Sequence, residues 1–377
     1  MHFAGDFNAQ NCIRIRPKII SSVIYRLTQI SEYWFVSTPF TVKKIEKYIK
    51  EYKPDVIQLI QPLIRFIDNE GLFRTIGKLN VPCVYTMIDE NAYLGNCDNA
   101  YNCEQFKITC EGCNGKNKAI NSQVDKCWCW SKRGCRRVAR NKRMGYECVK
   151  KIAFVAPKWV VERAQSSSLL RNKKFYIVDE YVNNIDVYYP RKKEDITLYE
   201  KYGIDREKVI IINIAKYTNP RKGVKYFLDL AKRLESNDKF QFVNVGYDGS
   251  IEKLPRNFVA VPFVSDQDKL AEFYSIADLA MITSFSDTMP NTSLEALSCG
   301  TPICGFNVTG IPYVAEKPLG VFVELGNVNE LVLVVLATLK KTKAISNKCR
   351  EYALLRYSPE VSVNKMLDIY REMIAKS

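Results

Sequence analysis

The alternation of short apolar, β-rich runs with longer amphipathic runs is the feature that most constrains the fold of this chain. In its second half, the pattern predicts buried strands at Val209–Tyr217, Phe240–Gly246, Phe258–Val264, Leu279–Ser284 and Thr301–Phe306. It predicts helices at Lys222–Ser236, Gln267–Ile276, Thr292–Ser298 and Val328–Lys340. Strands that alternate with helices in this way indicate βαβ units and a parallel sheet. We therefore expect a doubly wound α/β domain.

The first half of the chain carries the same pattern less regularly. Strands are expected at Lys53–Ile60, Val81–Ile88, Lys151–Pro157 and Lys174–Tyr181. The pattern then loosens into a linker over Val182–Pro190, and a last amphipathic helix is expected at Pro359–Ala375. A second α/β domain therefore precedes the first along the chain.

Composition narrows the class of protein. The 377 residues, 47% of them hydrophobic, suffice for one large or two ordinary domains. The only histidine is His2, next to the start of the chain, so catalysis by an imidazole group is nearly excluded. The number of cysteines, 13, is odd, which fits reduced thiols better than a set of disulfides. The apolar run Leu331–Ala337 is too short to cross a bilayer, and the first ten residues lack the core of a signal peptide. We expect a soluble, cytoplasmic protein.

The segment Ser284–Glu295 is expected to run from a strand end through a loop into a helix N-terminus. Ligands of open α/β sheets bind at such places, and helix N-termini favour phosphate. Pro290 and Asn291 fit the turn, and Thr292 or Ser293 can cap the helix. Glu295, one turn further on, can accept hydrogen bonds from ribose hydroxyls, or it can be only a favourable charge near the start of a helix.

The motif "DTMPNTSLEALSCGTPICGFNVTGIP", which begins at Asp287, resembles the nucleotide-sugar motif of family 4 glycosyltransferases with the GT-B fold. The resemblance implies that Glu295 holds the ribose and that the Asn291–Ser293 backbone faces the diphosphate, with Pro290 in the turn and Thr292 between. It also implies that Asp287 approaches the donor sugar. Asp287 stands where the family usually has glutamate.

A second segment, Asn213–Leu234, resembles the same family. Its Lys-Gly pair, Lys222 and Gly223, matches a lysine that clamps the pyrophosphate, and either Lys216 or Arg221 takes the place of a second cation. Fixed cations there lower the barrier because the leaving nucleoside diphosphate gathers negative charge. The alternative is a solvated basic loop.

The resemblance implies two Rossmann-like domains, residues 1–180 and 181–345, with a helical segment at 346–377 that packs back toward the first. It implies a retaining, hexosyltransferase-type enzyme of surface or capsular polysaccharide biosynthesis. The enzyme moves a sugar from a nucleoside-diphosphate donor to a lipid-linked or oligosaccharide acceptor, and transfer requires no cofactor. Asp287, Glu295 and Lys222 are the expected catalytic residues.

Two alternative functions remain open. The first is a degenerate homologue that binds nucleotide sugar or scaffolds a partner, and the second is a zinc-stabilised basic protein that binds nucleic acid. The donor motif disfavours nucleic acid as a partner.

A cysteine-rich insert is expected over residues 96–150. Cys97, Cys103, Cys110 and Cys113 follow the spacing C-x5-C-x6-C-x2-C and resemble an insert of capsule and exopolysaccharide members of the family. Four such thiols can hold a structural zinc ion, and buried thiols are the alternative. From Lys126 to Lys151 ten Lys and Arg stand against one acidic residue. This basic stretch is a solvated face, a peripheral contact with anionic lipid on the inner face of the cell membrane, or a contact with nucleic acid.

Two departures from the family pattern concern the first domain. The strand, Gly-rich loop and helix that open the family's first domain are not recognisable before Lys53, so we expect about forty N-terminal residues to be absent. Gln58, Ile60 and Ile88 also stand where related proteins carry histidine, although Asp89 remains. We therefore expect donor binding with slow transfer or none.

Overall fold

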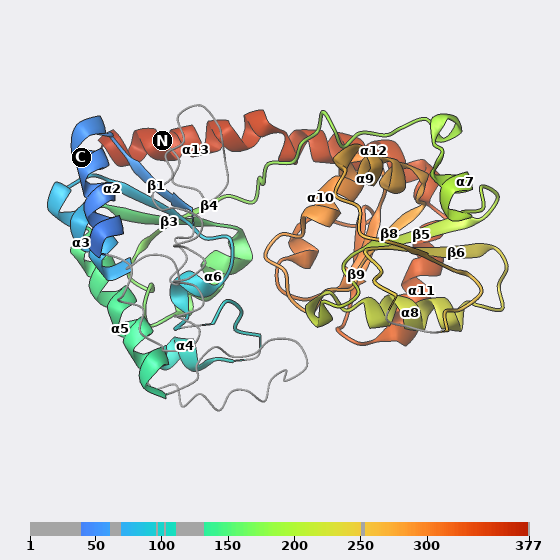
Figure 1. The fold of residues 1–377 in the computed structure, drawn as a ribbon, viewed down its shortest axis with the longest axis horizontal. Helices are drawn as coiled ribbons and strands as arrows, with labels where there is room; N and C mark the ends of the chain where they lie inside the picture. Colours follow the sequence, from blue (N-terminus) through green and yellow to red (C-terminus); the bar gives the residue numbers. More distant parts are fainter. Residues whose placement is uncertain are drawn as a thin grey trace.

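The computed structural model describes residues 39–60, 69–95, 97–101, 103–110, 132–249 and 253–375. These residues form two α/β domains, each built on a wholly parallel sheet, and a long C-terminal helix that runs from one domain to the other (Figure 1). The prediction of an α/β fold with two parallel sheets is confirmed.

The N-terminal domain contains a four-stranded sheet in the order β1-β2-β3-β4. Its strands are β1 (Ile57–Ile60), β2 (Cys83–Thr86), β3 (Ile152–Ala156) and β4 (Lys174–Ile177). Its helices are α2 (Pro39–Tyr52), α3 (Asn69–Leu79), the short η1 (Asn91–Tyr93) and α4 (Gln105–Ile108), α5 (Lys132–Cys148) and α6 (Lys158–Ser166).

The two faces of this sheet are covered by different parts of the chain. Tyr85 and Phe154 point toward α3, α5 and α6 and pack into one aromatic core with Phe73 and Tyr146. Alternate residues of the same strands, Val84, Ala153 and Val155, contact Ile369 and Met373 of α13 (Pro359–Ala375). Because side chains alternate between the faces of a strand, the second apolar face needs a cover, and the last helix of the chain provides it.

The C-terminal domain contains a six-stranded sheet in the order β10-β9-β8-β5-β6-β7. Its strands are β5 (Val209–Ile214), β6 (Phe240–Val245), β7 (Phe258–Val261), β8 (Leu279–Ile282), β9 (Ile303–Phe306) and β10 (Gly320–Val323). Its helices are η4 (Lys193–Asp195), α7 (Leu198–Tyr202), η5 (Pro220–Lys222), α8 (Val224–Arg233), α9 (Gln267–Ile276), α10 (Asn291–Ser298), η6 (Ile311–Tyr313), α11 (Val328–Leu339) and α12 (Thr342–Tyr357).

Helices cover both faces of this second sheet. Helices α9, α10 and α12 pack on one face, and α8 and α11 pack on the other (Figure 1). The sequence pattern did not indicate β10, which has four residues, or α7, which has five. The helical segment expected at 346–377 covers α13 and all but the first four residues of α12. The strands and helices predicted for this domain are present. Its strands, α8 and α11 are shorter than predicted, α9 has the predicted bounds, and α10 begins one residue earlier.

The strand order of the C-terminal sheet reverses between β5 and β8. From β5 the chain builds outward through β6 and β7, then returns to place β8 on the other side of β5. Loops that leave two such strands diverge to opposite faces of the sheet, and ligands bind in the crevice between them. The loops after β5 and β8 are therefore the part of this domain that the topology prepares for a ligand.

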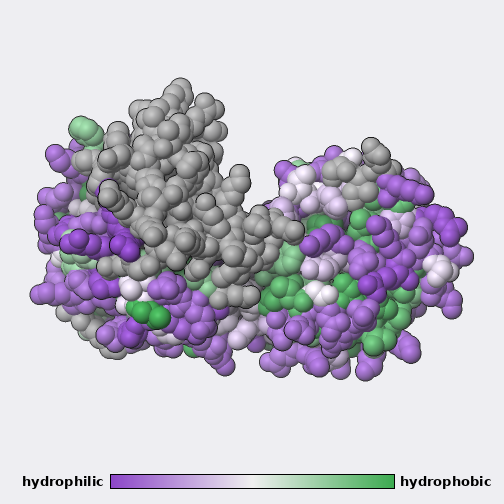
Figure 2. Space-filling model, turned by 90° about the horizontal axis from the view of Figure 1, so that it is seen from below, coloured by the Kyte–Doolittle hydropathy of each residue, from purple (hydrophilic) through white to green (hydrophobic). Residues whose placement is uncertain are grey.

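The two domains are joined by a segment without regular structure that follows β4 and ends near Pro190. Seen from below, the described residues of the two domains lie side by side (Figure 2). Within the described ranges, no helix combines the length and apolar character that crossing a membrane would demand.

Candidate functional site

The loops after β5 and β8 are bonded to each other. Phe285 donates its backbone N–H to the carbonyl of Arg221 at 2.8 Å, and the Thr283 hydroxyl donates to the carbonyl of Lys222 at 2.9 Å. Between them, Gly223 has φ +62°, and a Cβ at this position would lie 2.0 Å from the Thr283 carbonyl oxygen. The glycine of the Lys-Gly pair is therefore required, because only glycine permits this approach.

This close approach places Lys222 beside Asp287. The Lys222 Nζ atom lies 2.7 Å from Asp287 Oδ2, and both side chains are only partly exposed, at 27% and 16%. A cation from the β5 loop and a carboxylate from the β8 loop, 65 residues apart in sequence, thus meet beyond the carboxyl ends of the two strands. Two of the predicted catalytic residues lie in direct contact.

The backbone of Asp287 is fixed by the loop that follows β9. Its N–H donates to the Thr309 hydroxyl at 2.9 Å, and its carbonyl accepts the Gly310 N–H at 2.9 Å. Thr309 has φ +47°, a left-handed conformation that is strained for a β-branched residue. Strain of this kind persists only where surrounding contacts impose it, so the position of Asp287 is set by the fold.

Glu295 lies in α10, between the buried residues Leu294 and Ala296. The Tyr274 hydroxyl donates to its Oε2 atom at 2.9 Å. Burial raises the pKa of the Glu295 carboxyl above its ordinary value, while hydrogen bonds from Tyr274 and Tyr188 and the charge of Lys222 act in the opposite direction. The structure therefore keeps a carboxylate between two buried helix residues, and the positive charge of Lys222 favours its ionised form.

The N-terminus of α10 faces this site without a side-chain cap. The N-cap residue is Pro290, and neither Thr292 nor Ser293 caps the helix, so the expectation that one of them does is wrong. Asn291 is exposed and Thr292 is partly buried. Ser293 is fully buried, and its Oγ atom finds no hydrogen-bond partner in the described part of the chain. A buried hydroxyl without a partner is costly, and this one lies in the first turn of a helix whose N-terminus favours anions.

The two remaining predicted cations differ in setting. Lys216 is exposed at the start of the β5 loop, and Arg221 is partly buried in η5. Neither side chain forms an ion pair with any residue of the described ranges. Both therefore add positive charge beside Lys222 without being neutralised there.

The predicted zinc site finds no support. Cys97, Cys103 and Cys110 are described, whereas Cys113 lies outside the described residues. Among the residues that the structure describes, no three His, Cys, Asp or Glu side chains gather closely enough to hold a metal ion. Cys110 is buried and belongs to the core of the N-terminal domain, as does Phe106.

Sequence reasoning missed four residues of the site. Tyr188 and Tyr274 bring their rings within 6.4 Å of each other beside Glu295, and Thr309 and Gly310 fix Asp287. Thr309 and Gly310 lie inside the quoted motif, so their presence was visible although their contacts were not. The two tyrosines come from the linker and from α9, and no local pattern connects them with Glu295.

The raised pKa of Glu295 leads to a prediction about stability. Because ionisation of this carboxyl is disfavoured in the folded state, its favourable contribution is complete below the unfolded-state pKa of about 4.3 and is lost as the pH rises through the higher folded-state pKa. Glu295→Gln should therefore raise the melting temperature at pH 7, and the gain should shrink as the pH falls toward 4.5. Thermal unfolding across this range, with the exposed Glu351→Gln as a control, measures the effect. A gain that grows toward acid pH would contradict it.

Comparisons with known proteins agree with this geometry. Residues 208–341, which include β5 to β10, match the family described as Glycosyl transferases group 1. Two relatives are N-acetyl-alpha-D-glucosaminyl L-malate synthase of Bacillus anthracis (27% identical) and alpha-galactosylglucosyldiacylglycerol synthase of Streptococcus pneumoniae (24% identical). The first match covers 48% of this chain and 50% of the relative, and the second covers 61% and 63%. The chain thus aligns with about half to five-eighths of these relatives.

Solved structures extend the similarity over both domains. An Anabaena protein solved in complex with UDP superposes with a TM-score of 0.60 at 14% identity, over 89% of this chain and 82% of the other. A sucrose-phosphate synthase of Thermosynechococcus elongatus and a glycosyltransferase of Rickettsia africae each superpose with a TM-score of 0.62 over 90% of this chain, at 16% and 18% identity. They are covered to 78% and 83% of their own chains. The chain therefore has the GT-B fold, carries a Glycosyl transferases group 1 domain over residues 208–341, and is homologous to glycosyltransferases.

Proposed function

We propose that this chain transfers a sugar from a nucleoside-diphosphate sugar to an acceptor hydroxyl. The observation that carries the proposal is the contact between Lys222 and Asp287 at the point where the strand order of the C-terminal sheet reverses, with Glu295 in the helix that follows Asp287. A cation and two partly exposed carboxylates lie next to a helix N-terminus without a side-chain cap, and these groups match the diphosphate, the sugar and the ribose of such a donor.

The diphosphate belongs between the α10 N-terminus and the basic β5 loop. Lys222 already lies at this junction, and Lys216 and Arg221 add charge that no carboxylate of the described chain neutralises. The backbone of Asn291–Ser293 supplies N–H groups, and the unpartnered Ser293 hydroxyl lies in the same turn. As the bond to the sugar breaks, the departing phosphate gains charge, and cations fixed in advance stabilise it without reorganisation.

Ribose and sugar belong on either side of the diphosphate. Glu295 can accept hydrogen bonds from the ribose hydroxyls, and Tyr274 holds one of its oxygens in place. Asp287, clamped through its backbone by Thr309 and Gly310, is directed to the hydroxyls of the donor sugar. Similarity to an Anabaena protein that binds UDP supports a uridine nucleotide as the first donor to try.

We propose retention of configuration at the anomeric carbon, supported by the resemblance of the donor motif to retaining enzymes. In this reaction the bond from C1 to the phosphate oxygen breaks, and a bond from C1 to the acceptor oxygen forms on the same face. The departing phosphate takes the proton of the attacking hydroxyl. No side-chain base is then needed, which suits a site in which Ile60 and Ile88 replace family histidines.

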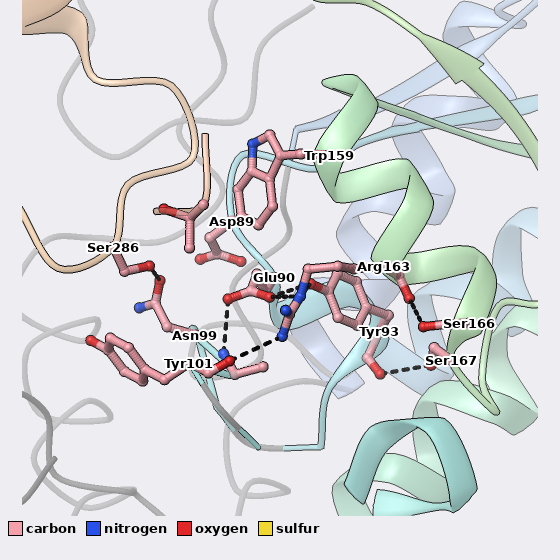
Figure 3. Close-up of polar contacts among 12 residues, drawn as sticks. Asp89, Glu90, Tyr93, Asn99, Tyr101, Trp159, Arg163, Ser166, Ser167 and Ser286 are labelled. Atoms are coloured by element: carbon pink, nitrogen blue, oxygen red, sulfur yellow. Dashed lines mark hydrogen bonds and ion pairs between the residues drawn. The ribbon is translucent and has the colours of Figure 1, made fainter. Parts of the chain in front are cut away.

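The acceptor is proposed to be a lipid-linked or oligosaccharide hydroxyl, and the pathway that of a surface polysaccharide. The name of the Streptococcus relative, which refers to a glycosylated diacylglycerol, supports a lipid acceptor. Asp89 follows β2 on the side of the N-terminal domain that faces the β8 loop (Figure 3), where an acceptor would lie. Peripheral contact of the basic α5 with anionic lipid is part of the same proposal.

Donor binding gives the first test of the proposal. Lys222→Met should weaken UDP binding at least about tenfold, because one charged hydrogen bond contributes about 1.5–3 kcal/mol. Lys232→Met, on the exposed side of α8, should leave binding within about twofold and serves as the matched control. Glu295→Ala should cost about 1.5–3 kcal/mol in the same calorimetric titration. Wild-type protein that binds neither UDP nor GDP would contradict the proposed site.

Turnover is the second test, with UDP-glucose as the donor. We expect slow release of glucose, below about 1 per second, because Gln58, Ile60 and Ile88 stand where related proteins carry histidine. Gln58 is moreover held by hydrogen bonds with Thr86 and Tyr370 at 2.9 and 2.6 Å, which leaves it less able to contact the donor or the acceptor. Proton NMR of the first-formed sugar should show the α anomer. An initial β anomer would exclude retention, and a rate typical of fast enzymes would refute the expectation of slow transfer.

A further inference from the structure

The β8 loop is held from both domains. Two polar contacts join it to the N-terminal domain at the residues that flank Asp287, and Figure 3 shows the one between Ser286 and Asn99. The Trp159 indole N–H donates to the Thr288 carbonyl at 2.8 Å, and the Ser286 hydroxyl donates to the Asn99 side-chain carbonyl at 3.0 Å. The residue proposed to face the donor sugar is therefore fixed on both sides by the other domain.

Trp159 also packs against the loop that clamps Asp287 from within the C-terminal domain. A Cβ added to Gly310 would lie 1.7 Å from the Thr288 carbonyl oxygen and 2.6 Å from Trp159 Nε1. There is thus no space for a side chain between the indole and the Asp287 clamp. A movement of Trp159 would therefore displace Thr288 and Gly310, and the Gly310 N–H donates to the Asp287 carbonyl.

A buried carboxylate fixes the spacing of the two contacts. Glu90, which is 1% exposed, accepts from Arg163 Nε at 2.9 Å and from the Ala100 N–H at 2.8 Å, and also binds the Tyr93 hydroxyl. Arg163 lies one turn after Trp159 on the same face of α6, and Ala100 follows Asn99. Glu90 thereby joins the helix that carries Trp159 to the loop that carries Asn99.

We propose that Trp159 and Asn99 are positioning residues that hold Asp287 in its working position through Thr288 and Ser286. The proposal rests on the proposed function for the role of Asp287. In this arrangement the C-terminal domain binds the nucleotide alone, but the sugar-facing carboxylate is aligned only while the N-terminal domain is in contact. A displacement of about 1 Å in such a group can reduce a rate a hundredfold, so the contacts affect turnover more than affinity.

Kinetics separate this role from a simple contribution to stability. Trp159→Phe keeps an aromatic ring and removes the N–H, and Asn99→Ala and Ser286→Ala remove the other contact from either side. Each should lower the rate constant for UDP-glucose hydrolysis about tenfold and leave the Kd for UDP within about twofold. The double variant Asn99→Ala/Ser286→Ala should be no slower than either single variant, because both changes remove one interaction. Asn329→Ala, an exposed amide on α11, is the control and should leave rate and affinity unchanged.

Hydrogen exchange tests the same proposal without any ligand. In Trp159→Phe and Asn99→Ala the amides of Asp287 and Gly310 should exchange about three- to tenfold faster than in the wild type, while those of β6 should not change. Unchanged exchange at Asp287 and Gly310, or a loss of UDP affinity that parallels the loss of rate, would overturn the proposal. Wild-type protein that fails to bind UDP would instead overturn the proposed function. The exchange data would still test whether Trp159 and Asn99 hold the backbone of Asp287 and Gly310 in place.

Discussion

The contact between Lys222 and Asp287 depends on the strand order of the C-terminal sheet, on the backbone conformation of the loops and on contacts with the N-terminal domain. The reversal of strand order places the β5 and β8 loops beside each other, and Gly223 lets them approach closely enough for the ion pair to form at 2.7 Å. The loop after β9 fixes the backbone of Asp287, and the N-terminal domain contacts both of its neighbours. Topology, backbone conformation and domain contact thus converge on one pair of charges.

Three features of the segment from Asp287 to Pro312 lower the stability of the fold, and the requirements of folding alone do not explain them. Glu295 is a carboxylate whose pKa is raised by burial, Ser293 has a hydroxyl without a partner among the described residues, and Thr309 has a left-handed backbone. Each is unfavourable in isolation, and all three lie within the motif that runs from Asp287 to Pro312. Local violations of otherwise consistent folding rules gather at functional sites. Their concentration here, and not the fold by itself, is the physical argument for a binding site.

The sequence was most informative where chemistry and pattern are local. Alternating runs predicted nine of the ten described strands, and only β10 was missed. The Lys-Gly pair and the run from Asp287 to Glu295 led to residues that the structure brings together. The sequence was least informative where contacts come from distant elements. Tyr274 is 21 residues from its partner Glu295 in the sequence, and Trp159 is 129 residues from its partner Thr288. Neither Tyr274 nor Trp159 lies in a recognised motif. The cysteine spacing predicted a zinc site that finds no support among the described residues, and Cys110 is buried in the core of the N-terminal domain.

A structure of the full chain with UDP tests the central claim most directly. The account predicts the diphosphate at the N-terminus of α10, with the Lys222 amine on a phosphate oxygen and the Glu295 carboxylate within hydrogen-bond distance of the ribose hydroxyls. It also predicts that Asp287 stays beside the sugar-facing end of the diphosphate, with the Trp159 and Asn99 contacts intact. A nucleotide bound elsewhere, or one that leaves Glu295 bonded only to tyrosine, would contradict the account.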